Sequence, residues 1–432
     1  MNKTQLKEMA CAAIDANRKQ IIAFGQAREA CPELGYAEHL TAAATKAELT
    51  NIGVTDIQSV ALTGLKGWMR GKQNNATVML IGELDAVISP EHPLADKTTG
   101  AAHACGHAAQ LAVLTGSAHG IAAVKDYLHG DVCFTAAPAE EFVQIEERQA
   151  LRKEGKIRAL GGKQEMILRG DFDDIDIAMM VHAITDVPYP TVMTGGSSLG
   201  FIGKEVRFIG REAHAGTAPW LGVNALNAAS LALQAIHALR ETFRDADMIR
   251  VHPIITKGGD IVNTVPADVR MTCYVRGINQ EAVSKANAQV NRAITHSAMA
   301  LGATAEIEDI PGYVPLIQNT DLDNLFAANA KIATPDICIE DGVVFGGSTD
   351  MGDVSWLIPS IHPRVSGFSG ALHSSKVVVS DENLAYILPA KLLAMTVIDL
   401  LASDAKEALR VKEMYPRKTK EEYAEVLGFG RE

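Results

Sequence analysis

Three short apolar runs, each ending in a carboxylate or a histidine, constrain this 432-residue chain more than any other feature. They are TVMLIGELDA (77–86), GDVCFTAAPAEE (130–141) and IDIAMMVHA (175–183). Runs of this kind are typical of strands buried on both faces, and residues 109–125 between the first two have helical spacing. We therefore expect an α/β fold whose sheet is mixed but mostly parallel and is flanked by helices.

The pattern changes after residue 195, where alternation between apolar and polar residues begins. We expect strands at 203–216, 249–259, 267–277 and 303–310 and helices at 224–243 and 279–301, which gives the order β-α-β-β-α-β. We infer a discontinuous catalytic domain, 1–195 and 312–432, interrupted by an inserted α+β domain at 196–311. Helices are also expected at 3–28 and 37–52, and the charged tail 404–432 is predicted to be helical and peripheral.

Charge and cysteine usage narrow the class of protein. The net charge is −12 without a block of Lys or Arg, which argues against nucleic acid as a partner. The six cysteines have no paired spacing, so a disulfide framework is not expected. Charges interrupt the first twenty residues, and no uncharged apolar run reaches the roughly 18–20 residues of a membrane span. We expect a cytoplasmic protein without a membrane partner.

Residues with metal-ligand chemistry stand where the predicted strands end. Ligands of open α/β sheets bind beyond the carboxyl ends of strands, so these residues are expected to converge. Thiolate, imidazole and carboxylate together suit borderline divalent cations. The set that could hold two zinc or manganese ions, with the cysteine shared between them, is Cys105, His107, Glu141, His182 and His373.

Two further carboxylates have expected roles at this centre. Glu140 is the candidate general base toward water, provided that a turn brings it to the same side as Glu141. Asp85 is placed to hold a ligand imidazole through its other N–H. Each residue taken singly has an ordinary alternative, such as a solvated Glu-Glu pair or a histidine at the edge of the core. For Cys105, an inert buried thiol, a reactive thiol with His107 as its base and a redox thiol also remain open.

The motifs ELDA, HACGH, PAEE, MMVHA, REAHAG and LHSS, in this order, resemble the di-metal aminoacylase/carboxypeptidase family of metallopeptidases. The resemblance covers about residues 1–400 and is strongest to the branch of aminobenzoyl-glutamate hydrolases and auxin-conjugate amidohydrolases. It implies the same five metal ligands and Glu140 as the base. It also implies that 196–311 is a dimerisation (lid) domain through which the chain forms a homodimer.

The resemblance assigns three more residues. His214 in REAHAG corresponds to a lid histidine that reaches the partner subunit's active site and polarises the scissile carbonyl. Asn263 and Arg276 correspond to positions that hold the substrate carboxylate, a role that suits a guanidinium because it binds carboxylate through two hydrogen bonds. Without the resemblance, these three would be a strand-end residue, a turn residue and a member of a surface ion pair.

Two departures from the family pattern stand out. Ala108 follows His107 where relatives often have aspartate, and the charged segment 144–165 is longer than expected from auxin-conjugate relatives. We expect that segment to shape the substrate pocket or the dimer edge. The Gly-rich stretch 345–356 resembles the aminobenzoyl-glutamate branch, and since no lysine follows it, it is not a phosphate loop.

The predicted function is hydrolysis of the amide bond of a small N-acyl amino acid, such as an aminobenzoyl-glutamate-like conjugate, or of a short peptide. A di-metal aminopeptidase or dipeptidase is one alternative, although Arg276 favours recognition of a carboxylate over a free amine. A non-catalytic ligand-binding homologue is the alternative from another class.

Overall fold

The computed structural model describes residues 1–188 and 190–429, and they form two compact units. Unit 1 comprises Met1–Ser197, Ile317–Val344 and Asp353–Glu432. Unit 2 comprises Ser198–Leu316 and Phe345–Gly352. Compared with the inserted domain expected at 196–311, unit 2 also includes a short stretch of the Gly-rich loop.

Unit 1 is built around a six-stranded sheet in the order β1-β2-β6-β3-β7-β17. The strands β6, β3, β7 and β17 run parallel, and β1 and β2 form an antiparallel edge. Every residue of β3, β6 and β7 is buried, which fits a sheet covered on both faces. The expected α/β class is confirmed. The bounds are β1 (Thr55–Val60), β2 (Gly64–Met69), β3 (Thr77–Glu83), β6 (Asp131–Ala137), β7 (Ile177–Met180) and β17 (Ser360–Ile361).

A second sheet of unit 1 contains five strands, with β15-β9-β18-β19 in line and β8 paired with β18. The expected single strand at 175–183 is wrong, because β7 ends at Met180 in the first sheet and β8 begins at His182 in the second. β17 pairs with β7 in the first sheet, and the next strand, β18, pairs with β8 in the second sheet. The chain therefore crosses from one sheet to the other here as well. The bounds are β8 (His182–Thr185), β9 (Thr191–Thr194), β15 (Cys338–Asp341), β18 (Arg364–Ser369) and β19 (Val378–Val379).

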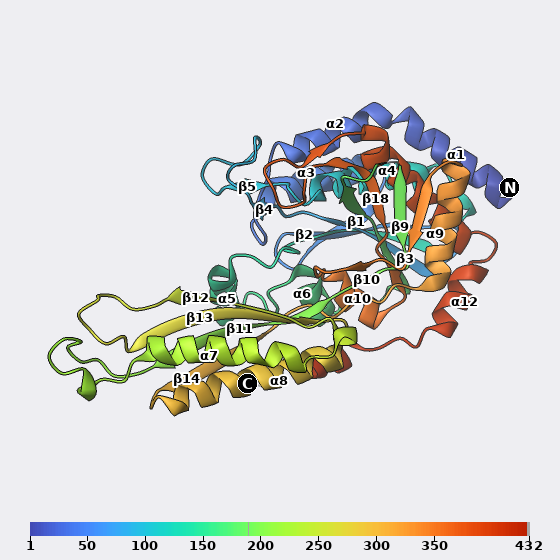
Figure 1. Ribbon diagram of the computed structural model, residues 1–432. Helices are drawn as coiled ribbons and strands as arrows, with labels where there is room; N and C mark the ends of the chain where they lie inside the picture. Colours follow the sequence, from blue (N-terminus) through green and yellow to red (C-terminus); the bar gives the residue numbers. More distant parts are fainter. Residues whose placement is uncertain (189, 430–432) are drawn as a thin grey trace. The chain divides into compact units, whose positions relative to one another are not determined.

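Helix α4 (His107–Ala122) packs on β3 and is surrounded by other helices of unit 1 (Figure 1). The helix expected at 3–28 is wrong as a single element, because it breaks at Asn17. The Asn17 amide donates to the carbonyl of Ala13, which ends the first helix locally. The surrounding helices are α1 (Lys3–Ala16), α2 (Arg18–Glu29), α3 (His39–Ile52) and α11 (Leu388–Leu401), and α9 (Thr320–Ala333) packs on α11.

The remaining elements of the chain are short. Within the described residues, one helical stretch, Asn383–Leu401, is long and apolar enough to cross a membrane, but 89% of it is buried as in a core helix. The short elements are β4 (Val87–Ile88), β5 (Ala101–Ala102), α5 (Ile145–Lys153), α6 (Gly162–Arg169), β10 (Ser197–Ser198), β16 (Val344–Phe345), α10 (Met351–Leu357), α12 (Lys406–Met414) and α13 (Lys420–Leu427).

The C-terminal tail is helical and mostly exposed, as predicted for 404–432, but a few of its side chains anchor it to the core. Tyr423 on α13 is fully buried, and its hydroxyl donates to Asp353 Oδ1 at 2.6 Å. Arg417 donates to the carbonyls of Phe172 and Ile175 ahead of β7. These contacts fix the tail to unit 1; its last residues, 430–432, lie outside the described part of the chain.

Unit 2 is a four-stranded antiparallel sheet in the order β12-β13-β11-β14, with α7 and α8 side by side on one face (Figure 1). The element order β-α-β-β-α-β is as predicted. Strand β11 is shorter than expected and ends at Ile209, which leaves the REAHAG motif in the following loop. The bounds are β11 (Gly200–Ile209), α7 (Ala225–Leu239), β12 (Arg250–Lys257), β13 (Asp268–Gly277), α8 (Gln280–Ala300) and β14 (Thr304–Pro311).

Candidate metal centre

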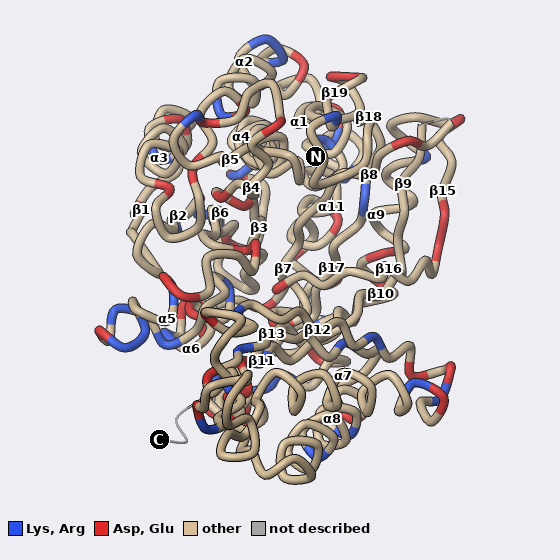
Figure 2. The backbone as a smooth tube through the Cα atoms, turned by 60° about the vertical axis from the view of Figure 1, so that its left-hand side comes forward, with Lys and Arg blue, Asp and Glu red and all other residues tan. Residues whose placement is uncertain are grey.

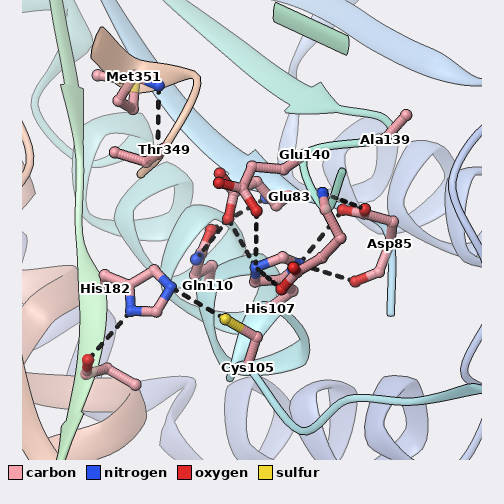
Figure 3. A network of polar contacts seen from close by, with 12 residues as sticks. Glu83, Asp85, Cys105, His107, Gln110, Ala139, Glu140, His182, Thr349 and Met351 are labelled. Carbon is pink, nitrogen blue, oxygen red and sulfur yellow. Dashed lines mark hydrogen bonds and ion pairs between the residues drawn. The ribbon is translucent and has the colours of Figure 1, made fainter. Parts of the chain in front are cut away.

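The three adjacent parallel strands β6, β3 and β7 deliver side chains to one edge of the first sheet. The helix that follows Cys105 begins at His107, with Gly106 as its N-cap. Gly106 has φ +91°, and a Cβ there would lie 3.0 Å from that of Ala183, so this turn requires glycine. Cys105 and His107 are thereby fixed beside His182, the first residue of β8 (Figure 3).

The structure brings all five expected ligands together in unit 1. Cys105 Sγ lies 3.5 Å from His182 Nε2 and 3.2 Å from His373 Nε2. His373 Nε2 lies 3.2 Å from Glu141 Oε1. Three groups have ligand atoms within 4.8 Å of one another: Cys105–His107–His182, Cys105–Glu141–His373 and Glu83–His107–Glu140. Because Cys105 belongs to the first two groups, its sulfur is placed to be shared by two ions.

Unpartnered buried atoms show that this donor set fits a cation. His107 Nε2 and Glu141 Oε1 are buried and have no hydrogen-bond partner within the described protein. Buried polar atoms are normally paired, so atoms left free in a cluster of this composition are candidates for metal binding. His373 adopts φ +62°, and such strain in a non-glycine residue is concentrated at functional sites. Sulfur, imidazole and carboxylate donors together fit two borderline divalent cations.

A sharp turn after β6 aims both glutamates at the centre. Ala139 has φ +50°, and its N–H donates to Glu38 Oε1 at 2.8 Å. The N–H of Glu141 donates to Asp85 Oδ2 at 2.9 Å. With the backbone held at both positions, Glu140 Oε2 and Glu141 Oε1 each lie 3.9 Å from His107 Nε2. The extended geometry that would separate the two side chains is therefore absent here.

Carboxylates lie near both ring nitrogens of His107, whose Nδ1 contacts the backbone carbonyl of Asp85 (Figure 3). Nδ1 lies 2.8 Å from the carbonyl oxygen of Asp85 and 3.3 Å from its Oδ1. Glu83 Oε2 lies 3.0 Å from Nε2. Sequence reasoning missed Glu83, the last residue of β3, although it precedes Asp85 by only two residues. Its position at the end of a fully buried strand was the available signal.

Burial and charge set the protonation of this centre. Burial would raise the pKa of Glu83, but the Lys163 ammonium and His107 hold it well below its usual range. Burial likewise opposes ionisation of Asp85, and His107 holds its pKa below the usual value. Burial, and then the charge of Glu141, raise the pKa of the Cys105 thiol well above its usual range. A raised pKa opposes a reactive thiolate; as a ligand, the thiol would give up its proton to a cation.

The remaining expected site residues lie in unit 2. His214 Nδ1 accepts hydrogen bonds from the N–H groups of Gly216 and Thr217, both at 3.1 Å, and its Nε2 lies 3.1 Å from Asn263 Nδ2. The two side chains are thus neighbours on exposed loops. No contact joins them to Arg276 among the described residues.

Arg276 on β13 occupies a different setting. It is half-buried, and its guanidinium donates to Ser348 Oγ at 2.6 Å. Its Cζ lies 5.1 Å and 5.6 Å from the ring centroids of Phe201 and Tyr274. Within the described part of the chain no carboxylate pairs with it, so a ligand could supply the negative charge.

Comparison with known proteins gives a consistent picture. A family model described as peptidase dimerisation domain matches residues 197–300. The chain is 27% identical over 423 residues to a Xaa-Arg dipeptidase from Mus musculus, covering 93% of this chain and 90% of the relative. It is 30% identical over 230 residues to one of the subunits of p-aminobenzoyl-glutamate hydrolase from Escherichia coli K12, covering 51% of this chain and 48% of the relative.

A solved structure shares the fold. It is a dinuclear metal-binding peptidase of the M20 family from Bacillus subtilis, with a TM-score of 0.70 and 19% identity over 90% of this chain and 99% of that one. The motifs, the dimerisation domain and the relatives agree. The chain therefore contains a peptidase dimerisation domain, resembles metallopeptidases of the di-metal aminoacylase/carboxypeptidase family in its motifs and relatives, and is a hydrolase acting on amide bonds.

Proposed function

We propose that the protein hydrolyses the amide bond between an acyl group and an amino acid, in a small N-acyl amino acid or a short peptide. The observation that carries this proposal is the pair of ligand groups that share Cys105, with Glu140 beside them. When bound, two zinc or manganese ions would acidify a water molecule and polarise the scissile carbonyl. We assign Cys105, His107, Glu141, His182 and His373 as the residues that hold them.

Glu140 is proposed as the general base. Its carboxylate is mostly buried at the edge of the centre, close to His107 but outside the two ligand groups that share Cys105. We propose that Glu140 takes a proton from the attacking water and passes that proton to the leaving amine. Asp85 is proposed to hold the His107 ring through Nδ1, so that Nε2 faces the centre.

Unit 2 is proposed to recognise the substrate. His214 Nδ1 accepts two backbone hydrogen bonds, which orient the ring with Nε2 toward the side chain of Asn263, and we propose that Nε2 donates to the carbonyl oxygen of a substrate. We propose that this donation occurs across a homodimer formed through the dimerisation domain. Asn263 and Arg276 are proposed to hold the substrate carboxylate, and the absence of a carboxylate partner for Arg276 in the described chain supports this role.

The leaving group is proposed to be an amino acid with a free α-carboxylate. The two relatives described above are named for a dipeptide ending in arginine and for aminobenzoyl-glutamate. Both substrates release an amino acid from an amide. Arginine and glutamate carry opposite side-chain charges, so the shared feature is the α-carboxylate, which suits Arg276.

The test combines metal content with product release. Purified protein is analysed by mass spectrometry for metal, and amino acid release is measured on acylated amino acids, aminobenzoyl-glutamate and Xaa-Arg dipeptides. The matched control for each substrate is its C-terminal amide. We expect about two metals per chain and metal-dependent release only from the free acids. Failure to bind zinc or manganese would overturn the proposal and favour a non-catalytic binding protein.

The dipeptidase alternative is kept because the Mus musculus relative is named for it. A dipeptidase or aminopeptidase must recognise a free α-amine. Each dipeptide is therefore compared with its N-acetylated form. Preference for the acetylated form supports the amidohydrolase, whereas activity on the free amine alone supports the alternative.

A further inference from the structure

The turn that carries Glu140 has a strained backbone. Ala139, the residue before Glu140, has φ +50°, a value that residues other than glycine seldom adopt. Such a conformation persists only where the surrounding structure fixes it, and it is most common at functional sites. The contacts of Ala139 therefore indicate which residues hold the turn in place.

One side of the turn is held by the loop that precedes α3. Glu38 is fully buried, and its Oε1 accepts a hydrogen bond from the N–H of Ala139 at 2.8 Å. Its second oxygen, Oε2, lies 2.5 Å from Thr63 Oγ1, so the carboxyl group is fixed at both oxygens. A Cβ at Gly35 would lie 2.8 Å from Ala139 Cα. The loop is therefore packed directly against the turn.

The other side of the turn is held by the charged segment 144–165. The carbonyl oxygen of Ala139 accepts from the N–H of Gly162 at 3.1 Å and from Arg148 Nη1 at 3.4 Å. Arg148 also donates to the carbonyl of Leu160 at 3.0 Å. It is 1% exposed, although its helix α5 carries charges of both signs, as Figure 2 shows. Both backbone polar groups of Ala139 are thus bound by other segments of unit 1.

The ligand candidate on the same turn is held by a different carboxylate. The N–H of Glu141 donates to Asp85 Oδ2 at 2.9 Å. This contact does not involve Glu38, which binds the backbone on the other side of Glu140. Loss of the Glu38 carboxyl should therefore displace Glu140 more than Glu141.

We propose, on the basis of the proposed function in which Glu140 is the general base, that Glu38 is a positioning residue for that base. Glu38 acts through the backbone of Ala139 and directs the Glu140 carboxylate toward the attacking water. A misplacement of about 1 Å by a change away from the reacting atoms can lower turnover about 10²-fold. The loop before α3 then contributes to catalysis without touching the substrate.

The test compares three variants of the full chain. Glu38→Met removes the acceptor for the Ala139 N–H and keeps a side chain of similar length. Glu38→Gln keeps an acceptor oxygen, and it is a close substitute near neutral pH because burial raises the pKa of Glu38 to about 8. Glu33→Met is the matched control, since Glu33 lies on the same loop but accepts from the N–H groups of Leu40 and Thr41.

Three quantities are measured on each preparation: the kcat and KM of amino acid release, the metal content, and hydrogen–deuterium exchange of the peptide that contains Ala139. We expect Glu38→Met to lower kcat about 10- to 100-fold, with KM and metal content unchanged and with faster exchange at the turn. Glu38→Gln and Glu33→Met should match the wild type in all three.

Wild-type kcat in Glu38→Met would overturn the role of Glu38, even if exchange at the turn were faster. Loss of metal in parallel with kcat would also overturn it, because the ligands and not the base would then be disturbed. If Glu38→Met does not fold, Thr63→Val decides, since it removes one contact of the Glu38 carboxyl.

Thr63→Val should lower kcat about 2- to 10-fold, the equivalent of one hydrogen bond, and unchanged kcat would again refute the proposal. A wild-type protein that shows no metal-dependent release of amino acid would instead refute the proposed function itself.

Discussion

Each unit contains a lysine whose side chain is completely buried, but the carboxylate that pairs with it is buried in unit 1 and partly exposed in unit 2. Lys163 of unit 1 pairs with Glu83, which is 1% exposed, whereas Lys204 of unit 2 pairs with Asp309, which is 37% exposed. In unit 2, water also solvates the carboxylate of Asp309. In unit 1 the pair is sealed, so only protein groups, and a bound cation, can balance it.

The two pairs also differ in their surroundings, because the buried pair lies beside the candidate metal centre and the partly exposed pair does not. A sealed ion pair seldom stabilises a protein relative to an apolar pair of the same volume. Unit 1 also buries Glu38, the residue before α3, whose pKa is raised to about 8 by burial and then by the charge of Asp85. Unit 2 places its other ion pairs, such as Arg207–Asp268, at partly exposed positions. Charge that is costly to bury is thus concentrated behind the candidate centre.

The largest expected effect is on catalysis in unit 1. Glu140→Gln removes the proposed base while the five ligand candidates remain, so turnover should fall about 10²–10⁴-fold with metal content unchanged. Release of amino acid and metal content are measured on the same preparation. Activity within about tenfold of the wild type would refute the assignment of Glu140.

The two lysines can be compared directly through stability. Lys163→Met leaves Glu83 charged and sealed, and we expect a loss of about 3–5 kcal/mol in the unfolding free energy of metal-free protein. Lys204→Met leaves Asp309 in contact with water, and we expect a loss of about 1 kcal/mol. Urea unfolding of both variants gives the comparison. Equal losses of unfolding free energy would mean that the buried pair of unit 1 and the partly exposed pair of unit 2 contribute equally to stability.

Arg276 tests whether unit 2 contributes recognition. Arg276→Met should lower kcat/KM for substrates with a free carboxylate about 10- to 100-fold, since a hydrogen bond to a charged group contributes about 1.5–3 kcal/mol. The amidated form of each substrate is the control and should be affected little. An equal loss on both forms would show that Arg276 does not bind the carboxylate.

The smallest expected effect concerns an exposed charge of unit 2. Hydrogen bonding to Arg207 lowers the pKa of Asp268 to about 2. Because the pKa of Asp268 is lower in the folded than in the unfolded state, where it is near 3.8, its charge stabilises the folded protein above pH 3.8. This stabilisation is lost as the pH falls toward 2. Since this pair is partly exposed, Asp268→Asn should cost no more than about 1 kcal/mol at pH 6 and nothing near pH 2. A cost that persists at pH 2 would contradict this account.

Much of the fold and of the candidate centre could be predicted because apolar runs and strand ends are local features. The strands β3, β6 and β7 appear where the runs occur, and their parallel pairing brings distant side chains to one edge. Glu83 was missed because the residue type alone does not distinguish a buried carboxylate from a solvated one, and only its place at the end of a buried run indicates burial. Lys163 was missed because its charged segment has the composition of an exposed helix.

Other misses depend on tertiary packing. The change from the first sheet to the second at Val181 leaves no mark in the run 175–183, because each half is a good strand. Tyr423 lies in a polar segment, and its burial depends on Asp353, which is 70 residues away in sequence. The role of His214 depends on the second protomer of a dimer, and so it stays a prediction.

The passage of the chain between the two sheets of unit 1 has a mechanical consequence. His182 opens β8 and His373 follows β18, so both belong to the second sheet, whereas Glu141 follows a strand of the first. Cys105 stands at the head of a helix packed on the first sheet. Ions held by these residues would therefore link the two sheets of unit 1. Removal of the ions would weaken the contact between the two sheets as well as abolish catalysis.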